Sequence, residues 1–581
     1  MLQRLIKLAF CASFISLPAY AADDASSSKT WSSSDLGEVA VVQHAATLPA
    51  DWSKGPFMEI YVRGFKDSNG DGHGDLNGIT EKLDYIKSLG YTGIWLMPIF
   101  NSEDKNHGYA VKNYRELEPR YGKLEDLKRL LDEAHKRGIG IIVDYVINHS
   151  SDRHPLYLAS MEKNSPYRNW FMWQDGDKPE GWSGLNGESW YSANNAWFYA
   201  VFWERMPDFN LKNPEVIDFH VNNLKYWLNQ GVDGFRFDAV AYLVENGSIG
   251  WENQPENYKL MNKIQGVLAQ YQAPKYMVCE ATTDAPGFAA PEGCGSAFSF
   301  GLQKAIMKSV RYGRADRDLV AYVEKNPMNR MASFLSNHDA FAGMRIYNQL
   351  GGDMKAYRLA AATQFLLPGT PYTLYGEELG IDLATGAGGA DEQIRAPIPW
   401  TGEDRVVDAD NKAFYTKGGF TKLPPDKRNK MFRPLPDNWE KANVAAEEKD
   451  PDSILNFYRQ IIALRKGSQA LTSGSFKSLT AMQPVEPTPD AKGKKAKKPK
   501  APQWQEDQNI FTFMRELNGE QVLVAINYAE KDHDVVIDTG KKAAGQLEAL
   551  WPASPVSLPI DARGKAALRV PGAGFIVFKL Q

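Results

Sequence analysis

Apolar runs of strand length alternate with amphipathic segments of helix length from about residue 59 onward. The runs at 59–65, 91–100 and 139–149 are typical of strands, and the segments 79–90 and 124–138 between them are typical of helices. Nearly continuous apolar strands that alternate with helices of about 10 to 15 residues indicate a parallel sheet with helices packed on it. The pattern therefore predicts an α/β fold for this part of the chain.

The same alternation resumes near residue 214 and lasts to about residue 466. Further strands are predicted at 232–240, 275–283, 296–301, 331–339 and 370–380, and further helices at 214–231, 258–270 and 452–467. Eight strands with intervening helices favour a closed (β/α)8 TIM barrel over an open doubly wound sheet. After residue 467 short strands follow one another without helices, which predicts a C-terminal all-β domain, expected to be a sandwich.

One long segment interrupts the barrel pattern. It has no clean periodicity and is crowded with tryptophan, tyrosine and phenylalanine, and a long irregular insertion in a regular fold usually serves function. A second irregular stretch, rich in Pro and Lys, is predicted to be a disordered loop. The domains expected are the barrel at 51–147 and 211–466, the insertion at 148–210, and the β domain at 467–581 with its Lys/Pro-rich loop at 484–503.

The first 21 residues have the features of a cleavable export signal. Arg4 and Lys7 precede a short apolar core, and the sequence 19–21, Ala-Tyr-Ala, fits a cleavage site. The apolar run is shorter than the roughly 20 residues that span a bilayer, so we expect no stable membrane insertion. We expect an exported protein, periplasmic or extracellular, whose residues 22–50 form a flexible leader.

Removal of the signal would leave two cysteines, Cys279 and Cys294. We expect two buried free thiols, with a disulfide in an oxidising compartment as the alternative.

Composition narrows the class of partner. The formal net charge is −4 and the pI is about 6.2, which gives no electrostatic reason to expect nucleic acid. The 15 Trp and 26 Tyr suit a protein that stacks flat faces against sugar rings. We expect a soluble monomer.

Reactive side chains lie at the C-terminal ends of several predicted strands, where barrel enzymes place their catalytic groups. Each alone could be a helix cap or a salt-bridge partner, but their joint occurrence at several strand ends predicts a site at one rim of the barrel. They are Asp144, Asn148 and His149 in the last part of the third strand, Arg236 and Asp238 in that of the fourth, Glu280 in that of the fifth, and Asn337, His338 and Asp339 in that of the seventh.

Two of these carboxyl groups could carry out glycoside hydrolysis, which requires a pair of them across the scissile bond. Arg236 lies two residues before Asp238, hence on the same side of its strand, and would keep that carboxyl ionised. An aromatic, partly dry cleft would keep the other carboxyl protonated. Position and spacing alone do not say which carboxyl has which role.

The stretch DSNGDGHGDLNG, residues 67–78, has the spacing of a cation-binding loop. A calcium-sensor loop needs a bidentate Glu at its twelfth position and a helix on each side. The twelfth residue here is Gly78 and a predicted strand precedes the loop, so the sensor interpretation fails. Four side chains with oxygen ligands at this spacing still favour a bound metal over a metal-free turn.

Four segments resemble the signature regions of the α-amylase family, glycoside hydrolase family 13, and occur in that family's order. The four are DYVINH at 144–149, GFRFDAV at 234–240, the Glu280 region CEATT, and LSNHD at 335–339. MPDFN at 206–210, HGY at 107–109 and RAPIPW at 395–400 are similar to further recurring elements of the family. The resemblance runs from about residue 55 to 580 and implies a TIM barrel with an inserted B domain after strand three and a C-terminal β domain.

The resemblance also implies a role for each site residue. Asp238 would be the nucleophile of a retaining mechanism, Glu280 the general acid and base, and Asp339 the group that holds the 2- and 3-hydroxyls. Arg236 would keep Asp238 charged, His149 and His338 would bind hydroxyls, and Tyr109 would stack on the reacting sugar. A structural calcium ion would be bound by the side chains of Asp67, Asn69, Asp71 and Asp75 and the backbone carbonyl of His73.

Departures from the family pattern bear on the substrate. Ala241 and Tyr242 stand where many α-amylases have a Lys-His pair. Asn106 replaces an aspartate that is typical of exo-acting α-glucosidases. Ala239 follows Asp238 where relatives specific for α-1,6 bonds often have valine, which favours α-1,4 bonds. Residues 237–260 are similar to the corresponding stretch of trehalose synthase and amylosucrase. We expect an α-1,4-glucan hydrolase acting on starch, glycogen or maltooligosaccharides, with an exo-acting α-glucosidase, a transglucosylase and a silent glucan-binding relative as alternatives.

Overall fold

The computed structural model describes most of the chain. The described residues are 36–104, 107–402, 405–407, 413–415, 433–485, 503–541, 544–553 and 557–581. The predicted signal at 1–21, Asn106 and nearly all of the predicted loop at 484–503 lie outside these residues, so those expectations stay predictions. Within the described ranges no helix is both long and apolar enough to cross a membrane.

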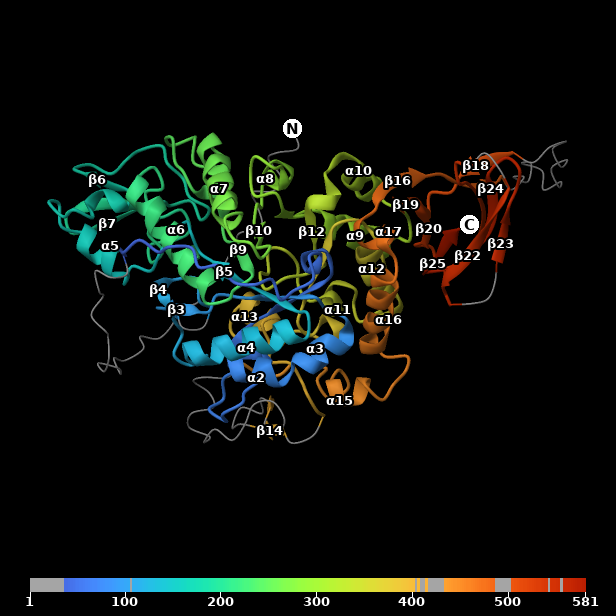
Figure 1. Cartoon of the computed structure of the whole chain (residues 1–581), viewed down its shortest axis with the longest axis horizontal. Coiled ribbons are helices and arrows are strands. Elements are labelled where there is room, and N and C mark those ends of the chain that lie inside the picture. The colour runs from blue at the N-terminus through green and yellow to red at the C-terminus, as the bar shows by residue number, and fades with distance from the viewer. Residues whose placement is uncertain are drawn as a thin grey trace, which may run out of the picture. The chain divides into compact units, whose positions relative to one another are not determined.

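Eight strands form a closed parallel barrel in the order β1-β13-β12-β11-β10-β9-β5-β2, which confirms the predicted TIM barrel. Figure 1 labels β5, β9, β10 and β12 among them. Nearly all of their residues are buried, as expected for a parallel sheet covered by helices. The strands are β1 (Phe57–Ile60), β2 (Gly93–Leu96), β5 (Gly140–Tyr145), β9 (Gly234–Phe237), β10 (Tyr276–Cys279), β11 (Ala297–Phe298), β12 (Met331–Ser333) and β13 (Thr370–Leu374).

Helices fill the connections between these strands. In α4 the residues Leu127, Leu130, Leu131 and Ala134 are buried at helical spacing, so one face packs inward and the charged face meets solvent. The longer helices are α2 (Leu76–Glu81), α3 (Leu83–Leu89), α4 (Leu124–Lys136), α6 (Pro214–Asn229), α7 (Pro255–Leu268), α9 (Leu302–Tyr312), α10 (Arg317–Lys325), α12 (Met354–Leu366) and α16 (Ile454–Lys466).

The sequence-based predictions missed several helices. The strand predicted at 59–65 ends at Ile60, and Val62–Phe65 forms the short helix α1, because the amide of Gly64 turns back to the carbonyl of Tyr61. Helices α9, α10 and α12 were not predicted. Helix α12 has no amphipathic pattern. Its residues from Leu359 to Leu366 are all buried, so it lacks the polar face by which an amphipathic helix is recognised.

The chain divides into two compact units. The first contains 60–83 and 94–298, with β2, β5, β9, β10 and β11. The second contains 51–59, 84–93 and 299–581, with most of β1, β12, β13 and the C-terminal strands.

The irregular segment after β5 contains a three-stranded antiparallel sheet in the order β6-β8-β7, formed by β6 (Trp173–Asp175), β7 (Trp190–Ala193) and β8 (Ala196–Tyr199). Many of its aromatic residues pack on one another; Tyr157 stacks on Trp173, with ring centroids 5.7 Å apart. Trp190 and Tyr199 share a core with Tyr242, which follows β9. Much of the aromatic excess seen in the sequence is therefore structural.

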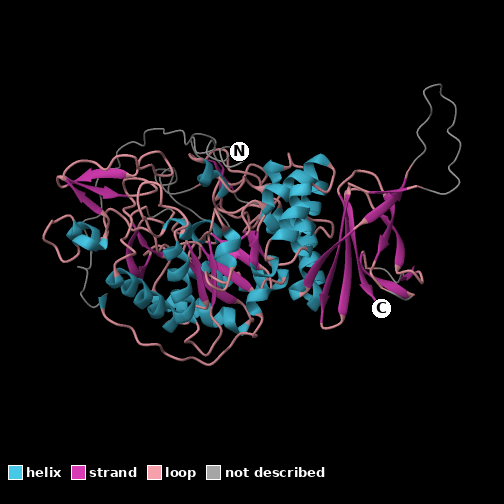
Figure 2. Cartoon of the chain, turned by 90° about the horizontal axis from the view of Figure 1, so that it is seen from above, coloured by secondary structure: helices cyan, strands magenta, loops and turns pink. Residues whose placement is uncertain are grey.

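The C-terminal part is all-β, as predicted, and Figure 2 shows how strands predominate there. Its strands form one ten-stranded antiparallel sheet, with a shared core that includes Leu523, Leu547 and Leu568. The buried guanidinium of Arg515 on β19 donates to the carbonyl of Leu366, the last residue of α12. The strands are β16 (Ser475–Leu479), β17 (Ala481–Pro484), β18 (Trp504–Glu506), β19 (Ile510–Leu517), β20 (Glu520–Asn527), β21 (His533–Asp538), β22 (Gly545–Trp551), β23 (Ser557–Ile560), β24 (Lys565–Val570) and β25 (Gly574–Leu580).

Candidate active site

A single guanidinium links three carboxyl groups at the ends of neighbouring barrel strands. Arg236 Nη1 lies 2.6 Å from Asp238 Oδ1 and 3.0 Å from Asp144 Oδ1, and its Nη2 lies 3.0 Å from Glu280 Oε2. The side chain of Arg236 is 1% exposed, and its Cζ lies 5.1 Å from the ring centroid of Trp95. The structure thus brings together four residues predicted for this rim of the barrel, Asp144, Arg236, Asp238 and Glu280.

Strand register explains this convergence. Parallel pairing places Arg236 beside Asp144 on β5 and beside Val278 on β10. Glu280 comes two residues after Val278, just as Asp238 comes two residues after Arg236, and side chains two apart point to the same side of a strand. The carboxyl ends of three adjacent strands therefore present their charged groups to one buried guanidinium.

The electrostatics of this cluster keep the arginine charged. Burial opposes the charge, but the carboxyls of Asp144, Glu280 and Asp238 and the Tyr109 hydroxyl raise the pKa of Arg236 well above its ordinary value. One cation facing three carboxyl groups leaves an excess of negative charge if all three are ionised, and a proton on one carboxyl reduces that excess. A site with one ionised and one protonated carboxyl is what acid-assisted nucleophilic displacement needs.

The carboxyl of Glu280 has a second anchor. Its Oε2 accepts a hydrogen bond from the amide of Ala239, 3.0 Å away, and Ala239 has a left-handed backbone with φ of 54°. This conformation occurs immediately after Asp238 and turns the amide toward the acid. Asp238 and Glu280 are each 7% exposed, so a small part of each remains open to a substrate.

Tyr109 and His149 lie near the same cluster. The Tyr109 hydroxyl donates to Asp144 Oδ2 at 3.1 Å, while its amide and that of Gly108 donate to Asp104. Burial lowers the pKa of His149 against the opposing charge of Asp238, so the imidazole is neutral. Its Nε2 has no hydrogen-bond partner in the part of the chain that the structure describes, which leaves it able to meet a hydroxyl group.

The second unit contains a separate charged cluster at the ends of β1 and β12. His338 Nδ1 lies 2.5 Å from Glu59 Oε1, and its Nε2 lies 3.1 Å from Asp339 Oδ2. Burial would lower the pKa of His338, but the charges of Asp339 and Glu59 and its hydrogen bonds to them raise it to about 10. Arg395 Nη2 lies 3.0 Å from Asp339 Oδ1, so Asp339 is held by two cations.

Glu59 and Arg395 were missed as site residues. Glu59 lies inside an apolar strand, and a charged residue at a fully buried strand position was the available signal. Arg395 is the first residue of the RAPIPW segment. Both ring nitrogens of His338 have partners within this cluster, so its predicted hydroxyl contact stays a prediction.

The loop at 67–75 has the backbone of a cation-binding loop. Asp67 Oδ1 accepts from the amides of Asn69 and Gly70, and its Oδ2 accepts from Gly72. Gly72, sixth in the loop, has φ of 93°, and cation loops of this spacing need glycine for the sharp turn there. Positions one, three, five and nine offer side-chain oxygens and position seven a backbone carbonyl, so the donor set fits calcium.

Several of these side-chain oxygens also accept hydrogen bonds within the loop and at the start of α2. Asp71 Oδ1 accepts from the amide of His73, and Asp75 caps α2 through the amide of Gly78 and accepts from Ser68. Burial raises the pKa of Asp67, a cost that a bound cation would offset. Within the described ranges no group of three or more His, Cys, Asp and Glu forms a metal cluster, so calcium remains a prediction.

A group of buried polar side chains includes Asn148, which follows β5. Asn148 Oδ1 and Asp208 Oδ2 have no hydrogen-bond partner among the described residues. Burial raises the pKa of Asp208 well above its ordinary range and that of Glu245 to about 8. Asn148 was predicted only as a polar group at the end of the third strand. The structure places it with Asp208 and Glu245, whose carboxyls fit a cation as well as they fit protons.

An aromatic pair stands beside the acid. Tyr242 stacks on Trp251, with ring centroids 5.8 Å apart and planes at 23°. The hydroxyl of Tyr242 lies 3.1 Å from Thr282 Oγ1, two residues beyond Glu280. Sequence comparison marked Tyr242 only as the replacement of a Lys-His pair, and nothing in the sequence pattern pointed to Trp251.

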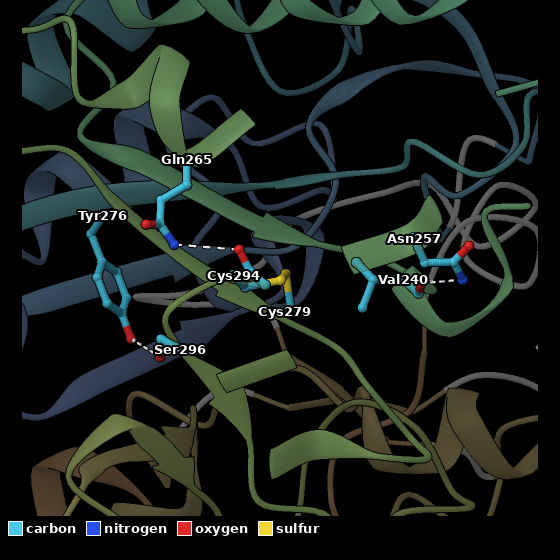
Figure 3. Close-up of a disulfide and its surroundings, with 8 residues drawn as sticks. Val240, Asn257, Gln265, Tyr276, Cys279, Cys294 and Ser296 are labelled. Carbon is cyan, nitrogen blue, oxygen red and sulfur yellow. Dashed lines mark hydrogen bonds between the residues drawn. A yellow bond between two sulfur atoms is a disulfide. The ribbon is translucent and has the colours of Figure 1, made fainter. Parts of the chain in front are cut away.

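The two cysteines form a disulfide, so the expectation of free thiols was wrong (Figure 3). Cys279 ends β10 and Cys294 lies in the loop before β11, with Cα atoms 6.3 Å apart. Neighbouring parallel strands bring together these residues, which are 15 positions apart in sequence. Spacing alone does not reveal this proximity, because the loop contains the short helix α8 (Ala285–Ala289).

Comparison with known proteins agrees with this geometry. The family model "Alpha amylase, catalytic domain" matches residues 59–474. Alpha-amylase 3 of Dictyoglomus thermophilum is 33% identical over 483 residues, covering 81% of this chain and 84% of that protein. The trehalose synthase of Thermus thermophilus is 30% identical, covering 81% of this chain and 49% of that protein. The crystal structure of an α-amylase from H. orenii is similar, with a TM-score of 0.69 and 31% identity, over 91% of this chain and 100% of that one.

Proposed function

The chain belongs to the α-amylase family, and from this premise we propose that it is a retaining hydrolase of α-1,4-glucosidic bonds in starch, glycogen or maltooligosaccharides. The family contains hydrolases and transferases on one barrel, so the residues of the site must carry the argument for the reaction.

The observation that supports a retaining mechanism best is the Arg236 bridge. Asp238 and Glu280 bind neighbouring nitrogens of one guanidinium at 2.6 and 3.0 Å, which holds the two carboxyls close together. Retaining enzymes have their carboxyls about 5 to 5.5 Å apart, whereas inverting enzymes separate them further to admit a water molecule. The bridge therefore favours direct attack by one carboxyl.

In the first step Asp238 Oδ attacks the anomeric carbon as the bond to the leaving sugar breaks. Glu280 donates its proton to the glycosidic oxygen, so the leaving sugar departs as a neutral alcohol. The positive charge of Arg236 stabilises the carboxylate of Asp238 before the attack. The products of this step are a glycosyl ester on Asp238 and an ionised Glu280.

In the second step Glu280 takes a proton from water, and the resulting hydroxide adds to the anomeric carbon. The ester bond breaks and Asp238 leaves as a carboxylate, so the product keeps the α configuration. The Ala239 amide that binds Glu280 stays in place through both steps and stabilises its ionised form.

The remaining site residues position the sugar. We assign the 2- and 3-hydroxyls to Asp339, whose carboxyl is held at 3.0 Å by Arg395 and at 3.1 Å by His338. We assign the stacking contact to Tyr109 and a hydroxyl contact to His149, whose neutral ring has an unpaired Nε2 within the described ranges. These assignments follow the family motifs residue by residue.

A calcium ion would have a structural role. The side chains of Asp67, Asn69, Asp71 and Asp75, with the carbonyl of His73, would hold it in the loop that follows β1 and α1. A second cation would suit Asn148, Asp208 and Glu245, because it would satisfy the unpaired buried oxygens of Asn148 and Asp208 and offset the burial of the Glu245 carboxyl. Bound calcium supplies charge compensation and rigidity at both places.

Export to an oxidising compartment is also proposed. The disulfide between Cys279 and Cys294 supports it, because disulfides persist in oxidising environments and are rare in the cytosol.

A transglucosylase is the second candidate. Tyr242 and Trp251 place an aromatic surface beside Glu280, and such a surface could retain a sugar as acceptor in place of water. The relatives include proteins named alpha-glucosidase and trehalose synthase as well as α-amylase.

Products from a panel of starch, maltotriose, isomaltose, sucrose and trehalose test the proposal. Short maltooligosaccharides released from starch support the hydrolase, and glucose alone supports exo action. Maltose converted to trehalose would overturn hydrolysis as the main activity.

A further inference from the structure

We propose that the disulfide between Cys279 and Cys294 positions Glu280 for proton transfer to the glycosidic oxygen. The inference rests on the proposed function and assigns a role to two residues outside the reacting groups. Cys279 immediately precedes Glu280, so the covalent link lies one residue from the acid.

Backbone hydrogen bonds to β9 and the residues after it fix the backbone around Glu280 on one side. Four residues of β10 pair with β9, from Tyr276 opposite Gly234 to Cys279 opposite Phe237. Beyond the strand, the amide of Glu280 donates to the carbonyl of Phe237, and the amide of Val240 donates to the carbonyl of Glu280. Movement of the acid toward or away from β9 therefore breaks several hydrogen bonds.

Fewer hydrogen bonds hold β10 on the side that faces β11. In the described part of the chain β10 pairs with β11 through one residue pair, Cys279 and Ala297, and the amide of Cys279 donates to the carbonyl of Ser296 at 3.1 Å. Tyr276 Oη and Ser296 Oγ lie 3.0 Å apart at the start of β10 (Figure 3). The disulfide adds a covalent link on this side of β10, which has fewer strand pairs than the side that faces β9.

The far end of the link is itself fixed. The amide of Cys294 donates to the carbonyl of Phe288 at 2.7 Å, and Gln265 of α7 donates to the carbonyl of Gly293 at 3.3 Å (Figure 3). Cys279 and Cys294 are 0% and 2% exposed, so the link is packed inside the protein. The disulfide therefore connects the end of β10 to a loop that hydrogen bonds already hold in place.

General acid catalysis is sensitive to this kind of restraint. The proton of Glu280 must reach the glycosidic oxygen as the bond to the anomeric carbon breaks, and a misplacement of about 1 Å can cost a factor of about 100 in rate. Attack by Asp238 depends on β9 and Arg236, which the disulfide does not touch. Loss of the disulfide should impair protonation of the leaving group while the nucleophilic attack remains.

Leaving groups that differ in their need for a proton separate these two effects. The double variant Cys279→Ser/Cys294→Ser is compared with the parent protein on maltotriose, whose glucose leaving group needs a proton, and on α-maltosyl fluoride, whose fluoride needs little help. Both substrates transfer the same maltosyl group to Asp238. The ratio kcat/KM reports the steps up to formation of the glycosyl ester, so slow hydrolysis of that ester does not enter the comparison.

We expect kcat/KM on maltotriose to fall about tenfold or more and kcat/KM on α-maltosyl fluoride to change less than twofold. The loss on maltotriose should lie in kcat and leave KM within about twofold. Tyr276→Phe is the matched control, because it removes a contact between the same two segments away from Glu280 and should leave the ratio of the two substrates unchanged. If the serine pair folds poorly, Cys279→Ala/Cys294→Val tests the same link with apolar side chains.

Equal loss on both substrates would overturn the proposal, because it would show that the disulfide only stabilises the fold. No loss on either substrate would overturn it as well. Failure of the proposed function itself looks different: the parent protein would act on neither substrate, or Asp238→Asn would keep full activity on both.

Discussion

The guanidinium of Arg236 lies 2.6 Å from the carboxylate of Asp238, and the two side chains are 1% and 10% exposed. The same guanidinium binds Asp144 and Glu280, so one buried cation organises the ends of three barrel strands. This bridge, and not any single carboxyl, is the feature on which the proposed chemistry depends.

Replacement of Arg236 by lysine keeps the charge and removes the bridge. An ammonium group cannot bind Asp238 and Glu280 through two fixed nitrogens, so Arg236→Lys should lower kcat/KM on maltotriose by about 100-fold or more. Arg153→Lys is the matched control, since the side chain of Arg153 is 59% exposed. Initial rates of reducing-sugar release measure both variants, and a loss of less than about threefold in Arg236→Lys would contradict the assigned role.

The aromatic pair beside Glu280 should bind the leaving or accepting sugar. Trp251→Ala removes the ring that stacks on Tyr242 and should raise KM for maltooligosaccharides by about three- to tenfold, as expected for one lost stacking contact. It should also lower the ratio of transfer products to hydrolysis products in chromatograms of a maltotriose digest. Trp203→Ala, at a tryptophan that is 39% exposed, is the control. An unchanged product ratio would show that the pair only packs.

His338 should make stability depend on alkaline pH. Its pKa is about 10 in the folded protein against an ordinary value of 6.5, so its contribution to the free energy of unfolding is complete below pH 6.5. The contribution should decline as the pH rises from 6.5 and be lost above about 10, with a slope of at most about 1.4 kcal/mol per pH unit. Urea unfolding between pH 6 and 10 measures the slope, and His338→Gln should reduce it.

The exposed His44 supplies the control for that experiment. His44→Gln should leave the slope as in the parent protein. A parent protein whose stability stays flat from pH 6.5 to 10 would contradict a protonated His338 between Glu59 and Asp339.

Removal of calcium should destabilise the protein more than it slows the reaction. Chelation with EDTA should lower the thermal midpoint by a few degrees while kcat at 25 °C changes less than twofold, because the loop at 67–75 contains no predicted catalytic group. The double variant Asp67→Asn/Asp71→Asn, which keeps most acceptor atoms, should lose most of this sensitivity to EDTA. Asp534→Asn, at a side chain 74% exposed, should keep it. A parent protein that melts at the same temperature with and without EDTA would argue against the metal.

The barrel could be predicted because its signal is local and repeated. Each strand is a short apolar run, and the groups that matter lie at the strand ends: Asp144 near the end of β5, and Asp238 and Glu280 directly after β9 and β10. The C-terminal domain followed from the same kind of pattern. Helix α12 could not be found this way, since burial on all sides removes the amphipathic period.

The parts that could not be predicted depend on register and on chain segments far apart in sequence. Glu59 contacts His338 across 279 positions, and no local pattern links them. The disulfide between Cys279 and Cys294 forms because β10 and β11 are neighbours in the barrel, and the sequence alone does not show how close this brings the two cysteines. Trp251 became visible as a partner of Tyr242 only in the folded protein.

Proton NMR of maltoheptaose during digestion distinguishes retention from inversion at the anomeric carbon. The spectrum shows the loss of α-1,4 linkages and the anomeric configuration of each new reducing end before mutarotation. We expect α-anomers to appear first and the β-anomer to grow in later by mutarotation. New reducing ends that appear first as the β-anomer, or a spectrum in which the α-1,4 signals do not change, would contradict a retaining α-1,4-glucan hydrolase built on Asp238 and Glu280.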